Sequence, residues 1–297
     1  MKKHFLMVFT FLLLLTANIV VGQEDFSKVN VRATIVAGNV YMITGLDDMT
    51  AFSGGNIGVC AGKDGVVMVD SKMAPLSDKV KKVIHELGGG NPKYIINTHV
   101  HGDHTGGNAA FRKDGTIIAQ TNVRKRLMAD KPEDLWPVIT FDQSLSIHFN
   151  GEEIKVMHYP HGHTDGDAVI YFTGSNVVHM GDLYFSGIFP FVDLDNGGSV
   201  TGYIDDIKKI IPELKEDVKI IPGHGPLSTL DDLKTNLRML EETTALVRRK
   251  MQSGASLDVI KKEGLQEEWK SWSWFFITTD RWIETIYKSY TKDASKM

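Results

Sequence analysis

The sequence predicts a mixed α/β fold of the α+β kind, built as a four-layer αββα sandwich. Two observations lead to this prediction. Short strand-like runs broken by glycine come first and are followed by helical segments, and the same order is then repeated along the chain. Two such halves packed face to face place both sheets in the middle and the helices outside.

The first half opens with runs rich in β-branched residues. The expected strands are Val31 to Val36, Val40 to Thr44, Asn56 to Ala61 and Val66 to Asp70. Residues 75 to 87 then follow a helical period, with apolar residues on one face and glycines 88 to 90 as the stop. The half ends with a strand at Lys93 to Asn97, a short helix, a strand near Thr116 to Ala119 and a helix from Thr121 to about Ala129.

The second half has a strand block from about Val138 to Met180, followed by helices. Its expected strands are Ser146 to Phe149, Ile154 to His158, Ala168 to Phe172 and Asn176 to Met180. A helix from about Val200 to Leu214 and a strand from Val218 to Ile221 follow, and the remainder is predicted to be mostly helical. Apolar residues of this tail fall on one helical face, which predicts packing onto the body: Trp282, Ile283, Ile286, Tyr287 and Tyr290.

The first 22 residues have the pattern of a cleavable secretory signal peptide. Lys2 and Lys3 precede an apolar run from Phe5 to Leu15, and the segment Val20-Val21-Gly22 stands before Gln23. The apolar run is shorter than the about 20 residues that a spanning helix needs, which disfavours a membrane anchor. We therefore expect cleavage after Gly22 and a periplasmic or secreted protein without a membrane partner.

Composition narrows the partners of the expected mature chain. Without the two signal lysines it has 31 basic and 37 acidic residues, a formal charge of −6 with neutral histidines. This balance argues against nucleic acid or an anionic membrane as a partner. Cys60 is the only cysteine, so no internal disulfide can form and stability must come from the core, with bound metal as a further source. These features leave the oligomeric state open.

The stretch NTHVHGDHTGGN, residues 97 to 108, places His99, His101, Asp103 and His104 within six positions directly after a strand-like run. Imidazole and carboxylate groups at the end of a strand are rigidly held metal ligands. His99 and His101 can face one point while Asp103 and His104 face another, so one turn can serve two neighbouring metal ions. Histidines that cap backbone groups in a polar loop are the ordinary alternative, which four ligand-type residues at this spacing disfavour.

Three later stretches can supply further ligands, since four residues do not satisfy two ions. They are His161-Gly162-His163-Thr164-Asp165, Met180-Gly181-Asp182 and Pro222-Gly223-His224-Gly225. Each follows an apolar run and carries glycine beside the ligand, which lets the backbone approach closely. His161 and His163 compete for one ligand position.

These motifs resemble those of the metallo-β-lactamase superfamily of metal-dependent hydrolases, over roughly residues 35 to 245. Val69-Asp70 is similar to its first motif, in which an aspartate supports the metal loop. The HxHxDH turn resembles the second motif and Gly162-His163-Thr164 the third, with Asp182 at the fourth and His224 at the last. The resemblance also implies the domain division: a metallohydrolase domain at residues 23–250 and a C-terminal helical extension at 251–297 packed on it.

The resemblance implies a site for two divalent metal ions. One ion would be held by His99, His101 and His163, the second by Asp103, His104 and His224, and Asp182 would bridge them. It favours His163 over His161, and it lets His179 support Asp182 from outside the ligand set. Zn²⁺ is the first choice, although histidine and carboxylate ligands suit iron and manganese as well.

The implied reaction is hydrolysis of an ester, thioester, lactone or related bond in a small-molecule substrate. Two ions about 3.5–4 Å apart acidify a bridging water to hydroxide, which attacks the electrophile. Asp103 would orient this nucleophile and shuttle a proton, and is therefore the expected catalytic residue.

Departures from the family pattern bear on the substrate. Lactamases with a cysteine ligand carry it where Asp182 stands and commonly have a lysine three residues later, where this chain has Phe185. Without that cysteine and lysine this lactamase branch is disfavoured, and a β-lactamase is kept only as an alternative. Glyoxalase II, another member of the superfamily, binds glutathione with basic residues of its C-terminal helices. The basic residues of this tail are better explained as a solvated helix face: Arg248, Arg249, Lys250, Lys261 and Lys262.

Two other classes of protein are weighed against the hydrolase. Some family members bind one iron and act as oxidoreductases, but the complete second ligand set disfavours this. A non-catalytic periplasmic metal-binding protein would close the coordination sphere, whereas seven ligands from four loops leave room for water.

Two stretches are expected to frame the substrate pocket. Gly45 to Gly55, with Met49 and Phe52, is predicted to be a flap. The loop from Tyr184 to Gly198 places four aromatic residues beside Asp182: Tyr184, Phe185, Phe189 and Phe191.

Overall fold

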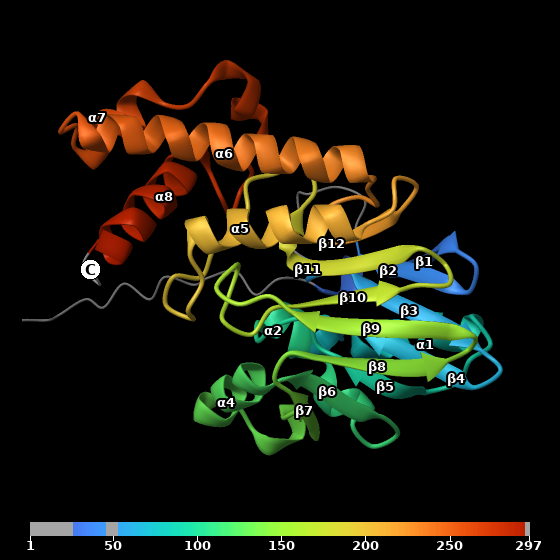
Figure 1. Ribbon diagram of the computed structural model, residues 1–297. Helices are drawn as coiled ribbons and strands as arrows, with labels where there is room; N and C mark the ends of the chain where they lie inside the picture. Colours follow the sequence, from blue (N-terminus) through green and yellow to red (C-terminus); the bar gives the residue numbers. More distant parts are fainter. Residues whose placement is uncertain (1–25, 46–52, 295–297) are drawn as a thin grey trace, which may run out of the picture.

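A computed structural model describes residues 26–45 and 53–294 of the 297-residue chain. The expected signal peptide lies outside the described residues, as do Met49 and Phe52 of the expected flap. The chain folds into two sheets with helices on their outer faces, and the predicted α/β sandwich is confirmed (Figure 1).

The first sheet has seven strands in sequence order. They are β1 Arg32–Ala37, β2 Val40–Thr44, β3 Ile57–Gly62, β4 Gly65–Val69, β5 Pro92–Ile96, β6 Thr116–Gln120 and β7 Ile139–Phe141. Strands β1 to β4 pair antiparallel, as expected for hairpins, and β4 to β7 pair parallel because helices connect them.

The second sheet has five strands in the order β12-β11-β10-β9-β8. They are β8 Ser144–Phe149, β9 Glu152–His158, β10 Ala168–Phe172, β11 Val177–Phe185 and β12 Lys219–His224. Within this sheet, as far as the structure describes it, only β11 and β12 pair parallel. The connection between these two strands contains helix α5.

Two sequence expectations need correction. The segment after Val138 does not open the second strand block, because β7 pairs with β6 and extends the first sheet. Strand β11 does not stop at Met180 but continues through Asp182 to Phe185. It continues because β12 pairs with it over this length, with irregular register after His179 and after Gly181.

Short helices and turns complete the first half, and longer helices follow the second. Those of the first half are η1 Phe26–Lys28, η2 Ala74–Leu76, α1 Ser77–Glu86, α2 Gly102–Thr105, α3 Asn108–Phe111, α4 Thr121–Asp130 and η3 Glu133–Leu135. Those of the second are α5 Val200–Ile210, η4 Ile211–Glu213, α6 Leu230–Gln252, α7 Leu257–Glu263, η5 Glu267–Trp272 and α8 Thr279–Ala294.

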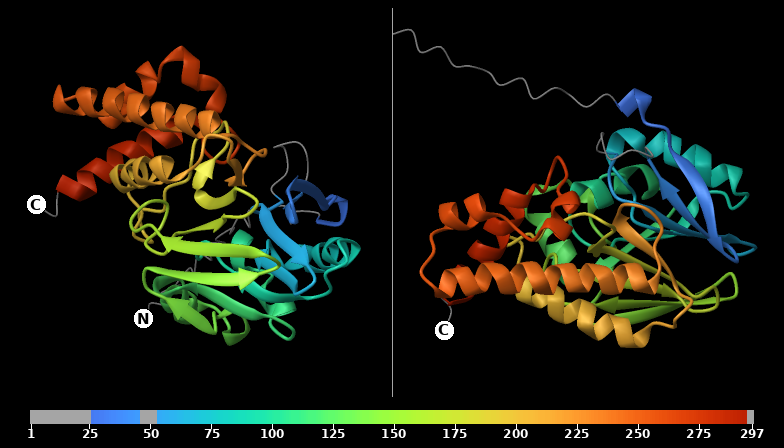
Figure 2. Two further views of the ribbon diagram at one scale, coloured as in Figure 1. Left: turned by 45° about the vertical axis from the view of Figure 1, so that its right-hand side comes forward. Right: turned by 90° about the horizontal axis from the view of Figure 1, so that it is seen from above.

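Alternation along the strands explains the layers. In β4, Val67 and Val69 face the core between the sheets, whereas Val66 and Met68 face the core under α1. In the second sheet, Ile170 faces the same central core and Val169 faces the core under α5 and α6. Because strands have a period of two, each sheet buries both faces. The right-hand view of Figure 2 shows α1 on one outer face and α5 and α6 on the other.

The C-terminal segment packs against the helices of the second half. Helix α6 begins with a capping box between Thr229 and Asp232 and runs past the expected boundary at residue 250. Helix α8 contacts α5, α6 and α7, and its Trp282, Ile283 and Ile286 are buried. None of the helices in the described ranges is both apolar enough and long enough to cross a membrane.

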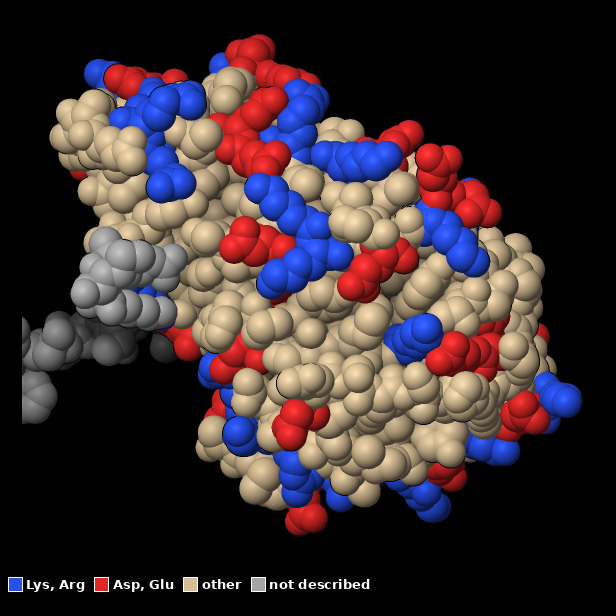
Figure 3. All heavy atoms as spheres, in the orientation of Figure 1, with Lys and Arg blue, Asp and Glu red and all other residues tan. Residues whose placement is uncertain are grey.

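The surface seen in Figure 3 mixes charges of both signs. Over the helices in the upper part of this view, Lys and Arg side chains alternate with Asp and Glu side chains. Ion pairs such as Lys208 with Glu241 and Arg238 with Glu268 account for part of this mixing.

Candidate metal centre

The metal loop, residues 97–108, follows β5 at the edge where the parallel strands end. His99 lies in a bend after β5, and His101 has extended backbone and is the N-cap residue of α2. Asp103 and His104 lie in that helix. The two pairs face different points, as the spacing predicted.

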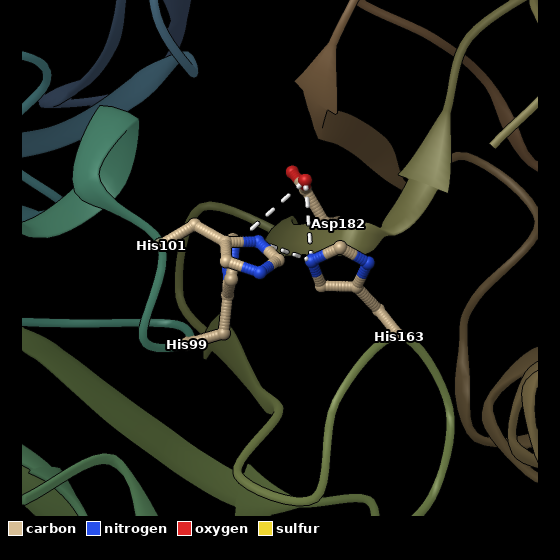
Figure 4. Close-up of side chains that lie close together, drawn as sticks. All are labelled: His99, His101, His163 and Asp182. Atoms are coloured by element: carbon tan, nitrogen blue, oxygen red, sulfur yellow. Dashed lines mark hydrogen bonds and ion pairs between the residues drawn. The ribbon is translucent and has the colours of Figure 1, made fainter. Parts of the chain in front are cut away.

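The first cluster unites His99, His101, His163 and Asp182, and Figure 4 shows the three rings and the carboxylate converging. His101 Nδ1 lies 2.9 Å from His163 Nε2. Asp182 Oδ2 lies 3.5 Å from His163 Nε2 and 3.7 Å from His99 Nε2. The ligand atoms within each cluster all lie within 4.8 Å of one another, which is close enough to surround one ion.

The second cluster unites Asp103, His104 and His224. Asp103 Oδ2 lies 3.3 Å from His224 Nε2 and 3.5 Å from His104 Nε2. Asp182 Oδ1 lies 3.1 Å from His104 Nε2 and 3.5 Å from His224 Nε2. The two oxygens of Asp182 therefore face different clusters, and the structure brings together all seven residues that the sequence singled out.

Hydrogen bonds on the far side of the rings fix which nitrogen faces each cluster. His163 Nδ1 donates to the Phe191 carbonyl oxygen at 2.7 Å, and His101 Nε2 donates to Asp193 Oδ2 at 2.7 Å. The Thr98 hydroxyl donates to Asp70 at 2.8 Å, so it accepts from His99 Nδ1 at 3.0 Å. Such outer contacts hold the tautomer and leave the inward nitrogen free to bind metal.

Asp70 supports the metal loop, as the resemblance implied. Its carboxylate accepts from the Thr98 backbone N–H at 2.7 Å and from His104 Nδ1 at 2.7 Å. The side chain is fully buried and its φ is +64°, a left-handed value that non-glycine residues rarely adopt. The hydrogen bonds of its carboxylate to Thr98 and His104 offset the cost of this backbone conformation.

The sequence reasoning missed Lys72 and Asp193. Lys72 is fully buried, and its Nζ donates to the Gly55 carbonyl oxygen at 2.7 Å and to those of Ser53 and Gly54 at 3.3 Å. It thereby fastens residues 53–55 beside the metal loop. Burial lowers the pKa of Lys72 to about 7, against the opposing effect of Asp103 and Asp70. Its place two residues after the strand-ending Asp70 was the available sequence signal.

Glycine leaves space for the ligands at two positions. A Cβ on Gly223 would lie 2.0 Å from Asp182 Oδ1, and a Cβ on Gly55 would lie 2.1 Å from His104 Cε1. Both distances are far below van der Waals contact, so any larger residue must displace one of these two side chains.

The two clusters differ electrostatically. Burial holds the pKa of His99 well below its usual range and lowers that of His163 to about 4, so these rings are neutral at pH 7. Burial also acts against charge at His104, but Asp182, Asp103 and Asp70 raise its pKa well above the usual range. The Asp182 carboxyl is held ionised by His104 and His224 in spite of its burial, so its pKa lies well below the usual range.

The donor set fits divalent metal ions. Within the described part of the chain, the buried atoms His99 Nε2 and Asp182 Oδ1 have no hydrogen-bond partner, and both point into the clusters. Buried polar atoms are normally paired, so orphaned atoms at the centre of a histidine and carboxylate cluster indicate a missing ligand. Imidazole with carboxylate suits zinc and other transition metals.

Two other histidines near the site do not join the clusters. His161 is exposed, has φ +66° and has its Nδ1 3.3 Å from the Gly197 carbonyl oxygen. His179 accepts from the Gly181 backbone N–H at 3.1 Å and donates to the Asn56 carbonyl oxygen at 3.2 Å. Its link to Asp182 therefore runs through the backbone just before that residue.

A cavity of about 420 Å³ opens over the clusters. Of the four aromatic residues expected there, Phe185 and Phe191 line it, whereas Tyr184 and Phe189 are buried in the core under α5 and α6. The sequence missed Trp274, Phe275 and Phe276, which line the cavity from the C-terminal segment.

The chain has two sheets with helices on their outer faces, and a cluster of histidines and aspartates lies near the ends of the strands. This combination defines the class of metal-binding αββα proteins. The sequence model of the metallo-beta-lactamase superfamily matches residues 51–224. The chain belongs to this superfamily.

Individual relatives are distant. The chain is 24% identical to the 2,4-dinitroanisole O-demethylase subunit alpha of Nocardioides sp. (strain JS1661), over 66% of this chain and 60% of that protein. It is 32% identical to the hydroxyacylglutathione hydrolase of Pelagibacter ubique (strain HTCC1062), over 44% of this chain and 51% of that one. The match thus spans about half to three-fifths of these two relatives.

Among solved structures, the metallo-beta-lactamase from Pontibacter korlensis is similar with a TM-score of 0.62 at 18% identity. The similarity covers 71% of this chain and 99% of that one. At this identity it shows the shared fold.

Proposed function

We propose that this protein is an exported dinuclear metal-dependent hydrolase that cleaves an ester, thioester, lactone or related bond. The observation that carries the proposal is the position of Asp182, whose two oxygens face two separate ligand clusters. A carboxylate placed in this way can bridge two ions.

The residues divide the work between two ions, with Zn²⁺ as the first choice. His99, His101 and His163 would hold one ion and Asp103, His104 and His224 the other, with Asp182 shared. When bound, such ions supply an acidified water as nucleophile and polarise the bond that is attacked.

Asp103 has the position of a catalytic residue. It lines the cavity, and its side chain is 15% exposed, whereas Asp182 is 4% exposed. Its pKa is lowered to about 2, because His104 and His224 outweigh the effect of burial. An ionised carboxylate at the cavity floor can orient an attacking water and accept its proton.

The β-lactamase alternative has less support from the site. The described residues that line the cavity include no lysine or arginine to hold the carboxylate of a β-lactam. At the position where lactamases with a cysteine ligand commonly place lysine, the ring of Phe185 stacks on His224 with centroids 5.1 Å apart.

The test is hydrolysis by the zinc-loaded full chain, with metal content measured on the same sample. We expect two zinc ions per chain and turnover of phenyl acetate or an acyl thioester above that of nitrocefin, a chromogenic β-lactam. Asp103→Asn should lower kcat more than its loss of metal explains. Two bound ions with no turnover of any ester, thioester, lactone or β-lactam would favour the metal-binding reading, and one bound iron with oxygen uptake would favour the oxidoreductase.

A further inference from the structure

The cavity above the clusters has a polar floor and aromatic walls. His101, Asp103, Asp182 and His224 form the floor. Among the described residues, five rings line the walls: Phe185, Phe191, Trp274, Phe275 and Phe276. The volume of about 420 Å³ lies within the range of about 300–1,000 Å³ that is usual for small-molecule sites.

Three of the five rings come from residues 274–276, which we call the aromatic loop. It lies between η5 and α8, outside residues 51–224 that match the superfamily. Phe189 N–H donates to the Trp272 carbonyl oxygen at 2.9 Å, and Trp274 Nε1 donates to the Phe189 carbonyl oxygen at 2.9 Å. The second bond ties the aromatic loop to the segment that follows Asp182, and the first ties the end of η5 to the same segment.

The rings form a continuous wall that reaches the metal site. Trp274 lies 6.4 Å from His224 and 6.3 Å from Phe185, between centroids. Phe276 contacts Phe191 edge to face at 5.5 Å, and Phe191 lies 5.6 Å from His101. A substrate whose bond lies over the clusters must therefore place its neighbouring group against aromatic faces.

Charge at the wall argues against an anionic substrate. Among the described residues, Arg281 makes cation–π contacts with these rings, its guanidinium lying 4.3 Å from the Phe276 centroid and 5.7 Å from that of Phe191. Its Nη1 donates to the Phe276 carbonyl oxygen at 2.8 Å, and it does not line the cavity. Arg281 thus supports the wall by cation–π contacts without lining the cavity.

We propose that the aromatic loop contacts the substrate and determines its specificity. The substrate carries an uncharged aromatic or similarly flat apolar group beside the bond that is cleaved. This inference rests on the proposed hydrolase function and names its substrate class. Flat rings of the ligand would pack against the offset and edge-on rings of the wall.

The first experiment compares esters in the zinc-loaded full chain. For each ester, kcat/KM is divided by the second-order rate constant of its hydrolysis by hydroxide, which corrects for intrinsic reactivity. We expect this ratio to fall from 2-naphthyl acetate to phenyl acetate to methyl acetate, by about tenfold or more in total. We expect 4-carboxyphenyl acetate to fall about tenfold below phenyl acetate. These ratios do not depend on the fraction of active protein.

Variants assign the preference to the aromatic loop. Trp274→Ala should lower the naphthyl-to-methyl ratio about tenfold. Trp272→Ala is the matched control, because Trp272 packs on Trp269 at 5.5 Å and does not line the cavity. Phe275→Ala removes a ring that is 56% exposed and serves if Trp274→Ala does not fold. An unchanged ratio in the loop variants overturns the inference, as does a preference for the carboxyphenyl ester that Arg281→Gln abolishes.

Binding of the product 2-naphthol, measured by equilibrium dialysis, separates this inference from the hydrolase proposal. We expect Trp274→Ala to raise the Kd about tenfold and Trp272→Ala to leave it unchanged, with weaker binding of 6-hydroxy-2-naphthoate. If no ester is cleaved but this binding pattern holds, the hydrolase proposal fails and the role of the aromatic loop in ligand recognition stands. If esters are cleaved but 2-naphthol binds equally to all variants, the hydrolase proposal stands and the role of the aromatic loop fails.

Discussion

Gly223 leaves the space that the shared carboxylate occupies. Since a Cβ at this position would lie 2.0 Å from Asp182 Oδ1 and 2.7 Å from the Gly181 backbone, Gly223→Ala must shift Asp182 or β12. We expect this variant to lose at least one metal ion per chain and about 100-fold in activity, measured by metal analysis and hydrolysis assays.

The metal loop itself supplies the matched control. A Cβ added to Gly102 would meet no described heavy atom within 4 Å, and the residue has no positive φ, so Gly102→Ala should retain both ions. Equal metal content in the two variants would contradict the role given to Gly223.

Asp206 is a buried carboxyl that the site does not use. Its side chain is 1% exposed, Oδ1 accepts from Lys209 Nζ at 3.1 Å, and Oδ2 has no hydrogen-bond partner within the described residues. Burial raises its pKa to about 6, with Lys209 and His161 opposing this and Asp205 adding to it. A folded-state pKa above the unfolded one means that folding favours the protonated form, so stability is lost as pH rises through about 6.

Asp206→Asn should therefore stabilise the protein at pH 8 by about 1–2 kcal/mol, after allowance for partial solvent screening. At pH 3, below the unfolded carboxyl pKa of about 3.9, the two proteins should differ little. Urea unfolding of zinc-free samples at both pH values checks this, and a difference independent of pH would show that folding does not shift the pKa of Asp206.

Most residues of the candidate metal centre could be predicted from sequence because they lie in short glycine-containing motifs after strand-like runs, although Asp182 lies within β11. His99, His104 and His163 needed only their own neighbours in the chain to be recognised. Asp193 acts through His101, 92 residues away, and a single sequence carries no signal for such a contact. The same limit applies to Trp274, which resembles any other aromatic of the tail until the fold places it beside His224.

At the scale of elements, α8 is what holds the aromatic loop against the cavity. Trp282 of α8 is fully buried, stacks on Phe189 with centroids 6.0 Å apart, and donates from Nε1 to Thr243 Oγ1 at 3.1 Å. Because Phe189 also bonds the aromatic loop, the packing of α8 and the shape of the cavity wall are coupled.

Trp282→Ala should lower the free energy of unfolding by about 3–5 kcal/mol, as expected for a large core ring. Trp282→Phe keeps most of the packing and should cost about 1–2 kcal/mol, chiefly through the lost hydrogen bond. Denaturant unfolding measures both, and equal costs would mean that ring volume contributes little at this position.

Most helices and strands could be predicted from the periodicity of the apolar residues and from the glycines that separate the segments. Strands β2 and β10 lie where the sequence placed them, because short runs rich in β-branched and aromatic residues between turns favour strands. The end of β11 was misplaced because its length is set by pairing with β12, a partner more than 30 residues away.

At the scale of the whole molecule, the candidate metal centre lies where the two halves meet. His99, His101, Asp103 and His104 come from the half with the seven-stranded sheet, and His163, Asp182 and His224 come from the other. Each cluster contains residues from both halves, because His163 belongs to the first cluster and His224 to the second. Bound ions would therefore cross-link the halves, and their binding free energy would add to that of folding.

Zinc should raise the stability of the full chain in proportion to its affinity. At a free concentration about 1,000 times the Kd, one site adds about 4 kcal/mol, and the corresponding rise in Tm is about 5–15 °C for a chain of this size. Thermal unfolding with zinc and with chelator measures the difference. His163→Ala should lose much of this rise, whereas His161→Ala, two residues away but outside the clusters, should retain it. An equal rise in both variants would mean that zinc stabilises the protein from somewhere other than the joint between its halves.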